Sequence, residues 1–245
     1  MGQTGAPEKE GGLKRAFDWR MIWTVHLEAR VPLLALVCAL LLSGCFGAYQ
    51  VKADNPAGAG LLMPTVKDKD IGLVGIARGF DLANFRVIAV ELFPVTDKSI
   101  KDDGDRQLAS HMEGYFQTEL VRRLRECGLF ERVINLSETD WQPGVERARA
   151  LILSGRITRL GEGSQALRLL FGVTGAGKAR AQAELTFVDV QTGQPVMVTA
   201  DRRIAQLGIP SFDSKDQLKE FFDVMARDLE KFLVRLSQGQ APKKS

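Results

Sequence analysis

The sequence has few of the residues on which catalytic and metal sites most often depend. It contains three cysteines and two histidines among 245 residues, and beyond position 45 only Cys127 and His111 remain. One cysteine cannot form an internal disulfide, and one thiol with one histidine cannot build a zinc site of the usual kind. No G-x-S-x-G motif marks a nucleophilic serine. We therefore expect no catalytic residue, no metal and no cofactor, and a protein that is not an enzyme. Cys127 is expected to pack as a small apolar side chain and His111 to lie at the surface.

An excess of charge of one sign is also missing. The chain has 33 basic and 30 acidic side chains, which gives a formal net charge of +3 at pH 7. Domains that bind nucleic acid usually carry a basic patch or stripe. We therefore expect no nucleic-acid partner, and the sequence specifies no oligomeric state.

The sequence also lacks a hydrophobic run long enough to cross a membrane. The apolar run over 31–42 has twelve residues, whereas a spanning helix needs about 20. Its length fits the apolar region of a secretory signal, typically about 7–15 residues. Counted from Met21 the signal has 24 residues, an ordinary size, whereas from Met1 it has 44, so Met21 is the favoured start. The alternative is a buried core helix that ends in Ser-Gly-Cys.

The residues that end this run, Leu42-Ser43-Gly44-Cys45, resemble the lipobox of bacterial lipoproteins. In that family the cysteine is lipidated and the signal is cut just before it. The resemblance implies that Cys45 is the first residue of the mature chain and its membrane anchor. Phe46 stands where the family's inner-membrane retention signal usually has aspartate. This implies the bacterial outer membrane, with the chain facing the periplasm.

Composition divides the chain into four parts. Residues 1–44 are predicted to hold a disordered extension and the lipoprotein signal peptide. Residues 45–71, with the lipidated cysteine, are rich in turn formers and are predicted to be a flexible tether. Residues 72–237 are predicted to form a single α+β domain, and residues 238–245 a disordered tail.

Apolar periodicity predicts two long helices in that domain. One stripe recurs every four residues from Leu108 to Leu124, and the other lies within a helix over about 215–236. Runs rich in β-branched and aromatic residues predict strands over 85–93 and 130–136.

From Ala150 onward, apolar and polar residues alternate in three successive segments, which predicts an antiparallel meander. Val196, Val198 and Ala200 are predicted to belong to the apolar face of its third strand. The expected fold is an α+β two-layer sandwich, with a mostly antiparallel sheet and the two main helices on one face. The other face of the sheet is expected to meet solvent or a partner.

The glycine-rich segment from Gly172 to Lys178 fits the phosphate-binding pattern G-x-x-x-x-G-K. The next position should be Ser or Thr, whose hydroxyl holds magnesium, but it is Ala179. The pattern should also open a helix, whereas the alternation after Lys178 predicts a strand. We interpret the segment as a bend between strands, with a degenerate nucleotide-binding protein as the less favoured alternative.

Residues 153–193 resemble the bacterial lipoproteins grouped as the domain of unknown function 4410 family. The shared pattern is a strand with G-x-I, a Gly-Ser-x-x-x-Arg turn, a glycine-rich loop and a strand ending in D-x-x-T-G. These positions are Gly155, Ile157, Gly163, Ser164, Arg168, Gly172, Gly175, Gly177, Asp189, Thr192 and Gly193. The resemblance extends over roughly 75–205 and implies an envelope location without a known enzymatic activity.

These features lead to one principal hypothesis. The chain is expected to be a lipid-anchored envelope lipoprotein that acts without catalysis as an interaction or accessory module and has an envelope protein partner. The alternative is a periplasmic domain that binds a small molecule or glycan through a glycine-rich loop over 161–177. The candidate residues of that loop, which otherwise serve as a structural bend, are Arg168, Gly172, Gly175, Gly177 and Lys178.

Overall fold

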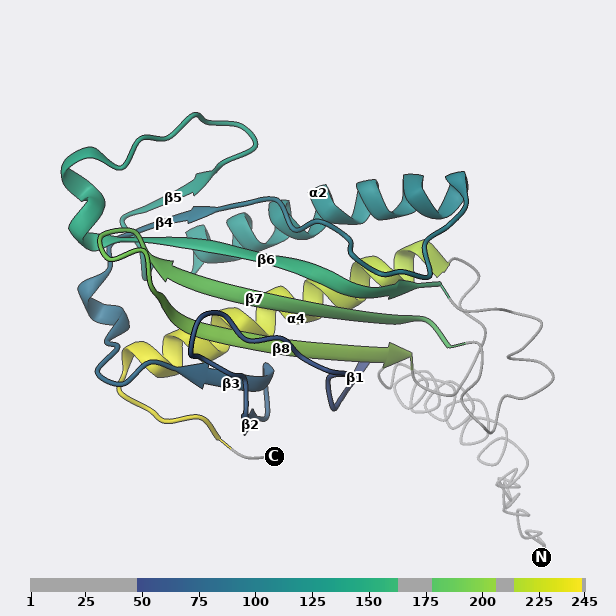
Figure 1. The fold of residues 1–245 in the computed structure, drawn as a ribbon, viewed down its shortest axis with the longest axis horizontal. Helices are drawn as coiled ribbons and strands as arrows, with labels where there is room; N and C mark the ends of the chain where they lie inside the picture. The colour runs from purple at the N-terminus through teal and green to yellow at the C-terminus, as the bar shows by residue number, and fades with distance from the viewer. Residues whose placement is uncertain (1–47, 163–177, 206–213, 244–245) are drawn as a thin grey trace, which may run out of the picture. The chain divides into compact units, whose positions relative to one another are not determined.

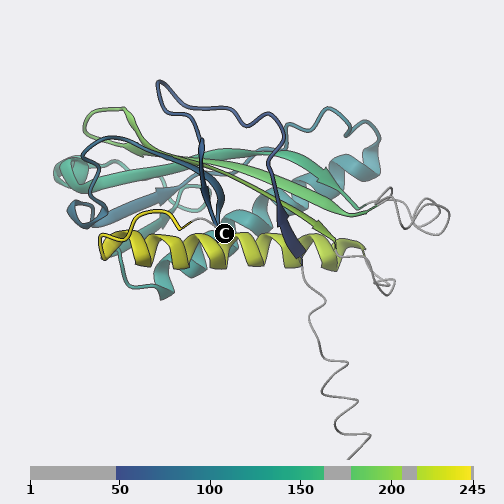
Figure 2. The same cartoon turned by 90° about the horizontal axis from the view of Figure 1, so that it is seen from below.

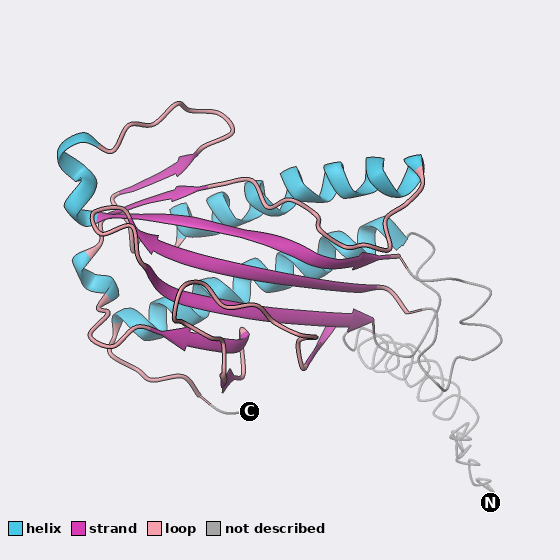
Figure 3. Ribbon diagram, in the orientation of Figure 1, coloured by secondary structure: helices cyan, strands magenta, loops and turns pink. Residues whose placement is uncertain are grey.

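Eight strands form one open sheet in the part of the chain that the computed structural model describes, residues 48–162, 178–205 and 214–243 (Figure 1, Figure 3). The strand order is β2-β3-β8-β7-β6-β4-β5, and β1 also pairs with β8. The strands are β1 (Ala48–Val51), β2 (Val66–Asp68), β3 (Gly72–Ile76), β4 (Val87–Val90), β5 (Arg132–Asn135), β6 (Ala150–Gly161), β7 (Arg180–Asp189) and β8 (Pro195–Ala205). The long helices are α2 (Asp103–Glu126) and α4 (Ser214–Ser237), and short 3-10 turns cover Leu82–Asn84 and Gly144–Arg149.

The sheet is mixed, with antiparallel pairs in the majority. β6, β7 and β8 form the predicted antiparallel meander, whereas β4 runs parallel to both β5 and β6. Helix α2 connects β4 to β5, and a parallel pair of strands needs a crossover of this kind. The predicted α+β class and its mostly antiparallel sheet are therefore confirmed, and the parallel pairs follow from the β4–α2–β5 unit.

Both long helices pack on the same face of the sheet (Figure 2). The aromatic ring of Phe116 on α2 lies 4.8 Å from that of Phe222 on α4 and 5.2 Å from that of Phe93. All three side chains are at most 1 % exposed, and burying each contributes about 1.5–3 kcal/mol. Of the helices in the described ranges, none has the length and apolar character that a membrane span requires.

Helix α2 begins and ends where its sequence provides the capping groups. The Asp102 carboxylate accepts a hydrogen bond from the Asp105 amide at 2.8 Å, which satisfies one of the free amides of the first turn. Arg123 and Arg125 lie in the last turn, near the negative end of the helix dipole. Gly128 follows with a φ of +67°, a left-handed conformation that glycine adopts without strain.

The predicted tether over 45–71 is corrected from residue 48 onward. β1 pairs with β8 along its whole length, and β2 pairs with β3. The segment between β1 and β2 crosses the sheet face opposite to α4 (Figure 2). There the Asp54 amide donates to Gln182 Oε1 at 2.7 Å, and Gln182 Nε2 donates to the Asp54 carbonyl at 2.9 Å. Such contacts use backbone groups and polar side chains, so they leave no apolar periodicity from which a sequence analysis could detect them.

The C-terminal end is likewise part of the fold as far as it is described. The Lys243 amide donates to Asp68 Oδ2 at 2.7 Å, and the Lys243 carbonyl accepts from the Lys69 amide at 2.8 Å. Arg235 of α4 forms an ion pair with the same Asp68 at 2.9 Å. The predicted disordered tail over 238–245 is therefore corrected for its described residues.

β8 presents charged side chains to the helices. Arg203 is 5 % exposed and pairs with Asp201 at 2.6 Å and with Asp228 of α4 at 3.1 Å. Burial raises the pKa of Asp201, against the opposing charge of Arg203. Because side chains alternate along a strand, Val198 and Ala200 lie on the other face, where both are buried but lie outside the main core cluster, so the predicted apolar face is not the one that meets the helices. A buried ion pair interrupts the apolar pattern that the prediction used.

Candidate functional site

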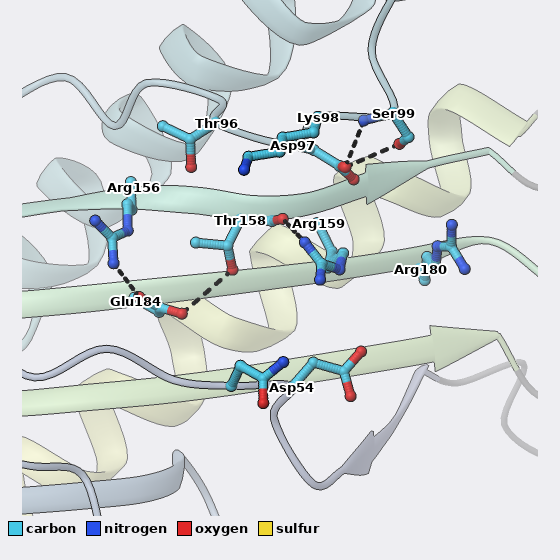
Figure 4. Close-up of a pocket in the computed structure, with 11 residues that line it drawn as sticks. Asp54, Thr96, Asp97, Lys98, Ser99, Arg156, Thr158, Arg159, Arg180 and Glu184 are labelled. Atoms are coloured by element: carbon cyan, nitrogen blue, oxygen red, sulfur yellow. Dashed lines mark hydrogen bonds and ion pairs between the residues drawn. The ribbon is translucent and has the colours of Figure 1, made fainter.

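A polar cavity of about 740 Å³ lies on the sheet face opposite to the helices (Figure 4). Its walls come from β6, β7, the segment after β1 and the loop between β4 and α2. The volume is within the range of about 300–1,000 Å³ that is typical of small-molecule sites. The lining residues are Asp54, Asn55, Thr96, Asp97, Lys98, Ser99, Arg156, Thr158, Arg159, Arg180 and Glu184.

A β-bulge in β6 directs two consecutive side chains into this cavity. Ile157 lies opposite Ala183 and Arg159 lies opposite Gln182, so Thr158 is the additional residue. Ile157 is fully buried in the core, whereas Thr158 and Arg159 both line the cavity. Bulges of this kind often redirect side chains next to functional sites.

The Glu184 carboxylate is bonded at both oxygens. Oε2 accepts from Arg156 at 2.9 Å and from the Ala57 amide at 3.3 Å. Oε1 accepts from Gln182 Nε2 at 3.2 Å and from the Thr158 hydroxyl at 3.4 Å. The negative charge of Glu184 is thus balanced by groups of the fold itself.

Asp97 ties the β4–α2 loop to β6. Its Oδ1 accepts from the amide and hydroxyl of Ser99 at 3.0 and 2.9 Å, and its Oδ2 accepts from the buried Leu160 amide at 2.9 Å. Burial alone would raise the pKa of Asp97, but these hydrogen bonds and the positive charge of Arg159 hold it below its ordinary value of 3.8. Asp97 is therefore an ionised structural acceptor at neutral pH.

The third carboxylate, Asp54, forms an ion pair with Arg202 of β8 at 2.5 Å. Together with the paired hydrogen bonds between Asp54 and Gln182, this contact holds the segment after β1 against the sheet. All three acidic side chains of the cavity are consequently engaged in holding the walls together.

The basic side chains of the cavity are less fully engaged. Arg156 pairs with Glu184, and Arg159 donates to the neutral Thr158 carbonyl at 2.8 Å. Lys98 and Arg180 form no hydrogen bond or ion pair with the residues that the structure describes. The cavity therefore has more cationic donors than it has free acceptors.

Of the residues predicted as a site from the sequence, only Lys178 is among the described residues. Cys45, Arg168, Gly172, Gly175 and Gly177 fall outside the described residues. Lys178 is described, but its ammonium group lies 5.4 Å from the centre of the Tyr49 ring and 3.3 Å from the Tyr49 hydroxyl, not in the cavity. Ala179 is fully buried and leads into β7, which confirms the predicted strand after Lys178 where a nucleotide-binding loop would open a helix.

Cys127 and His111 lie where the sequence analysis placed them. The half-buried Cys127 thiol donates to the Leu124 carbonyl at 3.2 Å, and burial raises its pKa, which favours the thiol over the nucleophilic thiolate. His111 is exposed on α2. Over residues 48–162, 178–205 and 214–243, no three His, Cys, Asp or Glu side chains gather in a way that could hold a metal ion.

Comparison with protein families finds one match in the central part of the chain. Residues 88–208 are similar to the family described as "Domain of unknown function (DUF4410)". This match confirms the resemblance for that part of the sequence, and the description of the family assigns no activity. A comparison with curated proteins finds no significant match.

Solved structures with a similar arrangement include proteins from three bacteria. The PelC dodecamer from Paraburkholderia phytofirmans has 16% sequence identity and a TM-score of 0.41, with 64% of this chain and 96% of that chain covered. A Xanthomonas campestris protein of the DUF330 family has 8% identity and a TM-score of 0.38, with 67% and 91% covered. A putative neuraminyllactose-binding hemagglutinin homolog from Helicobacter pylori has 10% identity and a TM-score of 0.32, with 66% and 90% covered. At these scores the similarity supports no inference about function.

Proposed function

We propose that the chain is a lipid-anchored interaction module of the bacterial outer membrane, which faces the periplasm and serves an envelope protein complex without catalysing a reaction. The observation that carries the proposal is the sequence Leu42-Ser43-Gly44-Cys45 at the end of the apolar run over 31–42. β1 of the folded unit begins at Ala48, directly after this motif.

The non-enzymatic part of the proposal is supported by the positions of the two reactive side chain types. Cys127 and His111 do not line the cavity of Figure 4. The carboxylates that do line it are engaged by neighbouring groups, so they hold the walls in place and are poorly suited to proton transfer. Binding is the role that such a surface supports best.

Metabolic labelling with palmitate tests the anchor directly. In a Gram-negative host the wild-type chain should incorporate label, fractionate with the outer membrane and have the mass of residues 45–245 plus acyl chains. Cys45→Ala should incorporate none, because its thiol is the proposed attachment point. Cys127→Ala is the matched control and should be labelled like the wild type, since this thiol belongs to the folded domain. An unlabelled wild-type chain that keeps its full length would overturn the proposal.

A second candidate function is the binding of a small molecule or glycan. The cavity over β6 and β7 favours it, because its volume of about 740 Å³ and its excess of donors suit a ligand. In this function the site lies on the sheet face opposite to the helices, here called the open sheet face. Arg159 and Arg180 lie there next to the connection that leads from β6 to β7. Thermal stabilisation of the purified chain by a ligand would support this candidate, and the effect should be lost when the cavity residues are substituted.

A further inference from the structure

The cavity contains two guanidinium groups whose positions are set by strand register. Gly161 of β6 lies opposite Arg180 of β7, and Arg159 lies opposite Gln182. Arg159 and Arg180 therefore occupy diagonal positions on antiparallel neighbours, where side chains begin roughly 7–8 Å apart. Figure 4 shows both on the cavity side of the sheet. Like charges so placed repel each other, and an anion between them removes that repulsion.

Among the described residues, the carboxylates that line the cavity do not supply that anion. Glu184 is bonded to Arg156, and Asp54 is paired with Arg202. Asp97 lies close enough to Arg159 to interact with its charge, but its oxygens accept hydrogen bonds from other groups. Arg180, with five N–H donors, has no partner among the described residues. The segment 163–177, which follows β6 in the sequence, contains no Asp or Glu.

The chemistry of the lining suits a phosphate group. Guanidinium groups bind phosphate oxygens through paired N–H donors, which gives short and strong charge-assisted hydrogen bonds. Lys98 adds an ammonium group without a partner in the described structure. The Thr96 and Ser99 hydroxyls on the same wall donate to the Ile157 carbonyl and to Asp97, so their oxygens can still accept hydrogen bonds from a ligand. The cavity is far larger than an inorganic phosphate ion, so the remaining space and hydroxyls would accommodate the rest of a phosphorylated molecule.

We propose that the cavity on the open sheet face binds a phosphate-bearing ligand, with the phosphate held between Arg159 and Arg180. Lys98, on the β4–α2 loop, adds positive charge to the same cavity. This inference rests on the second candidate function, ligand binding at the open face, and is independent of the lipid anchor. The phosphate could belong to a soluble metabolite or to a lipid headgroup, since both present the same oxygens to the arginines.

The test uses the full chain purified in an uncharged detergent. Inorganic phosphate should raise the thermal unfolding midpoint more than chloride does at equal ionic strength. Arg180→Gln and Arg159→Gln should each weaken phosphate binding about tenfold or more, as expected for the loss of a charge-assisted hydrogen bond. Arg180→Lys, which keeps the charge but loses the fork of donors, should lie between wild type and Arg180→Gln. Arg78→Gln is the matched control, because Arg78 is also exposed but does not line the cavity.

A second arm distinguishes the sources of the phosphate. If micelles doped with phosphatidylglycerol stabilise the chain in an Arg180-dependent way and inorganic phosphate does not, the ligand is a lipid headgroup. If inorganic phosphate stabilises the chain and this effect also depends on Arg180, a soluble ligand is supported. The proposal is overturned if neither probe acts, or if Arg180→Gln and Arg78→Gln respond alike. Stabilisation by a neutral oligosaccharide alone would keep the ligand-binding function but overturn the phosphate assignment.

Discussion

At the scale of single residues, Asp97 is the cavity residue whose replacement should lower the free energy of unfolding most. Replacing it with alanine leaves the buried Leu160 amide without its acceptor. We expect Asp97→Ala to lower the free energy of unfolding at pH 7 by about 2–3 kcal/mol, as measured by urea denaturation. Asp140→Ala, at an exposed position, should change it by less than about 0.5 kcal/mol.

The same residue predicts a dependence on pH. The folded-state pKa of Asp97 lies below its ordinary value of 3.8, so its contribution to stability is present above that value and is lost as the pH falls through the folded-state pKa. The difference between wild type and Asp97→Ala should therefore shrink between pH 5 and pH 2. A difference that stays constant over this range would show that the ionised carboxylate is not the stabilising form.

At the scale of elements, two glycines should respond to alanine in opposite directions. Gly155 of β6 has a φ of +157°, and a Cβ there would lie 2.2 Å from the Glu184 carbonyl oxygen of the paired strand. Gly155→Ala should cost about 3 kcal/mol through this contact. Gly114 lies in α2, and a Cβ added to it would meet no atom within 4 Å, so Gly114→Ala should stabilise the chain by about 0.5–1 kcal/mol. Equal unfolding midpoints for the two variants would contradict the strand geometry.

The elements also differ in how far the sequence predicted them. The apolar stripes of α2 and α4 recur with helical spacing over more than four turns, so both helices were predictable nearly to their ends. β1 and β2 were not, because backbone hydrogen bonds to neighbouring strands hold them and any sequence can form such bonds. The face of β8 was misassigned because Asp201 and Arg203 occupy positions where a sequence pattern expects apolar residues.

At the scale of the whole chain, the boundary of the folded unit can be tested by truncation. A chain that begins at Gly47 should unfold cooperatively with the stability of the full chain. A chain that begins at Gly72 loses β1, β2 and the acidic partners Asp68 and Asp70 of Arg235, which is 14% exposed in its side chain. Removing partners from a buried charge costs about 3–5 kcal/mol, so this chain should be destabilised by at least that amount. Equal urea midpoints for the chains that begin at Gly47 and Gly72 would instead support the predicted flexible tether.

The cavity could not have been predicted from the sequence at this scale. Its residues come from four segments between Asp54 and Glu184, and they meet only through strand order and the bulge at Thr158. The alternation of polar and apolar residues along β6 and β7 did indicate that one face of the sheet lies outside the core. The glycine-rich segment fits a known sequence pattern, whereas polar side chains on a strand face fit none.

The position of Ala48 has a consequence for how the molecule would be presented to its partners. Ala48 pairs with Ala205 at the end of the sheet, and only two residues separate it from Cys45. Three residues of extended chain reach about 10 Å. If Cys45 carries the lipid, the folded unit would therefore be held close to the bilayer surface. The sheet end with Tyr49 and Lys178 would then lie near the headgroups.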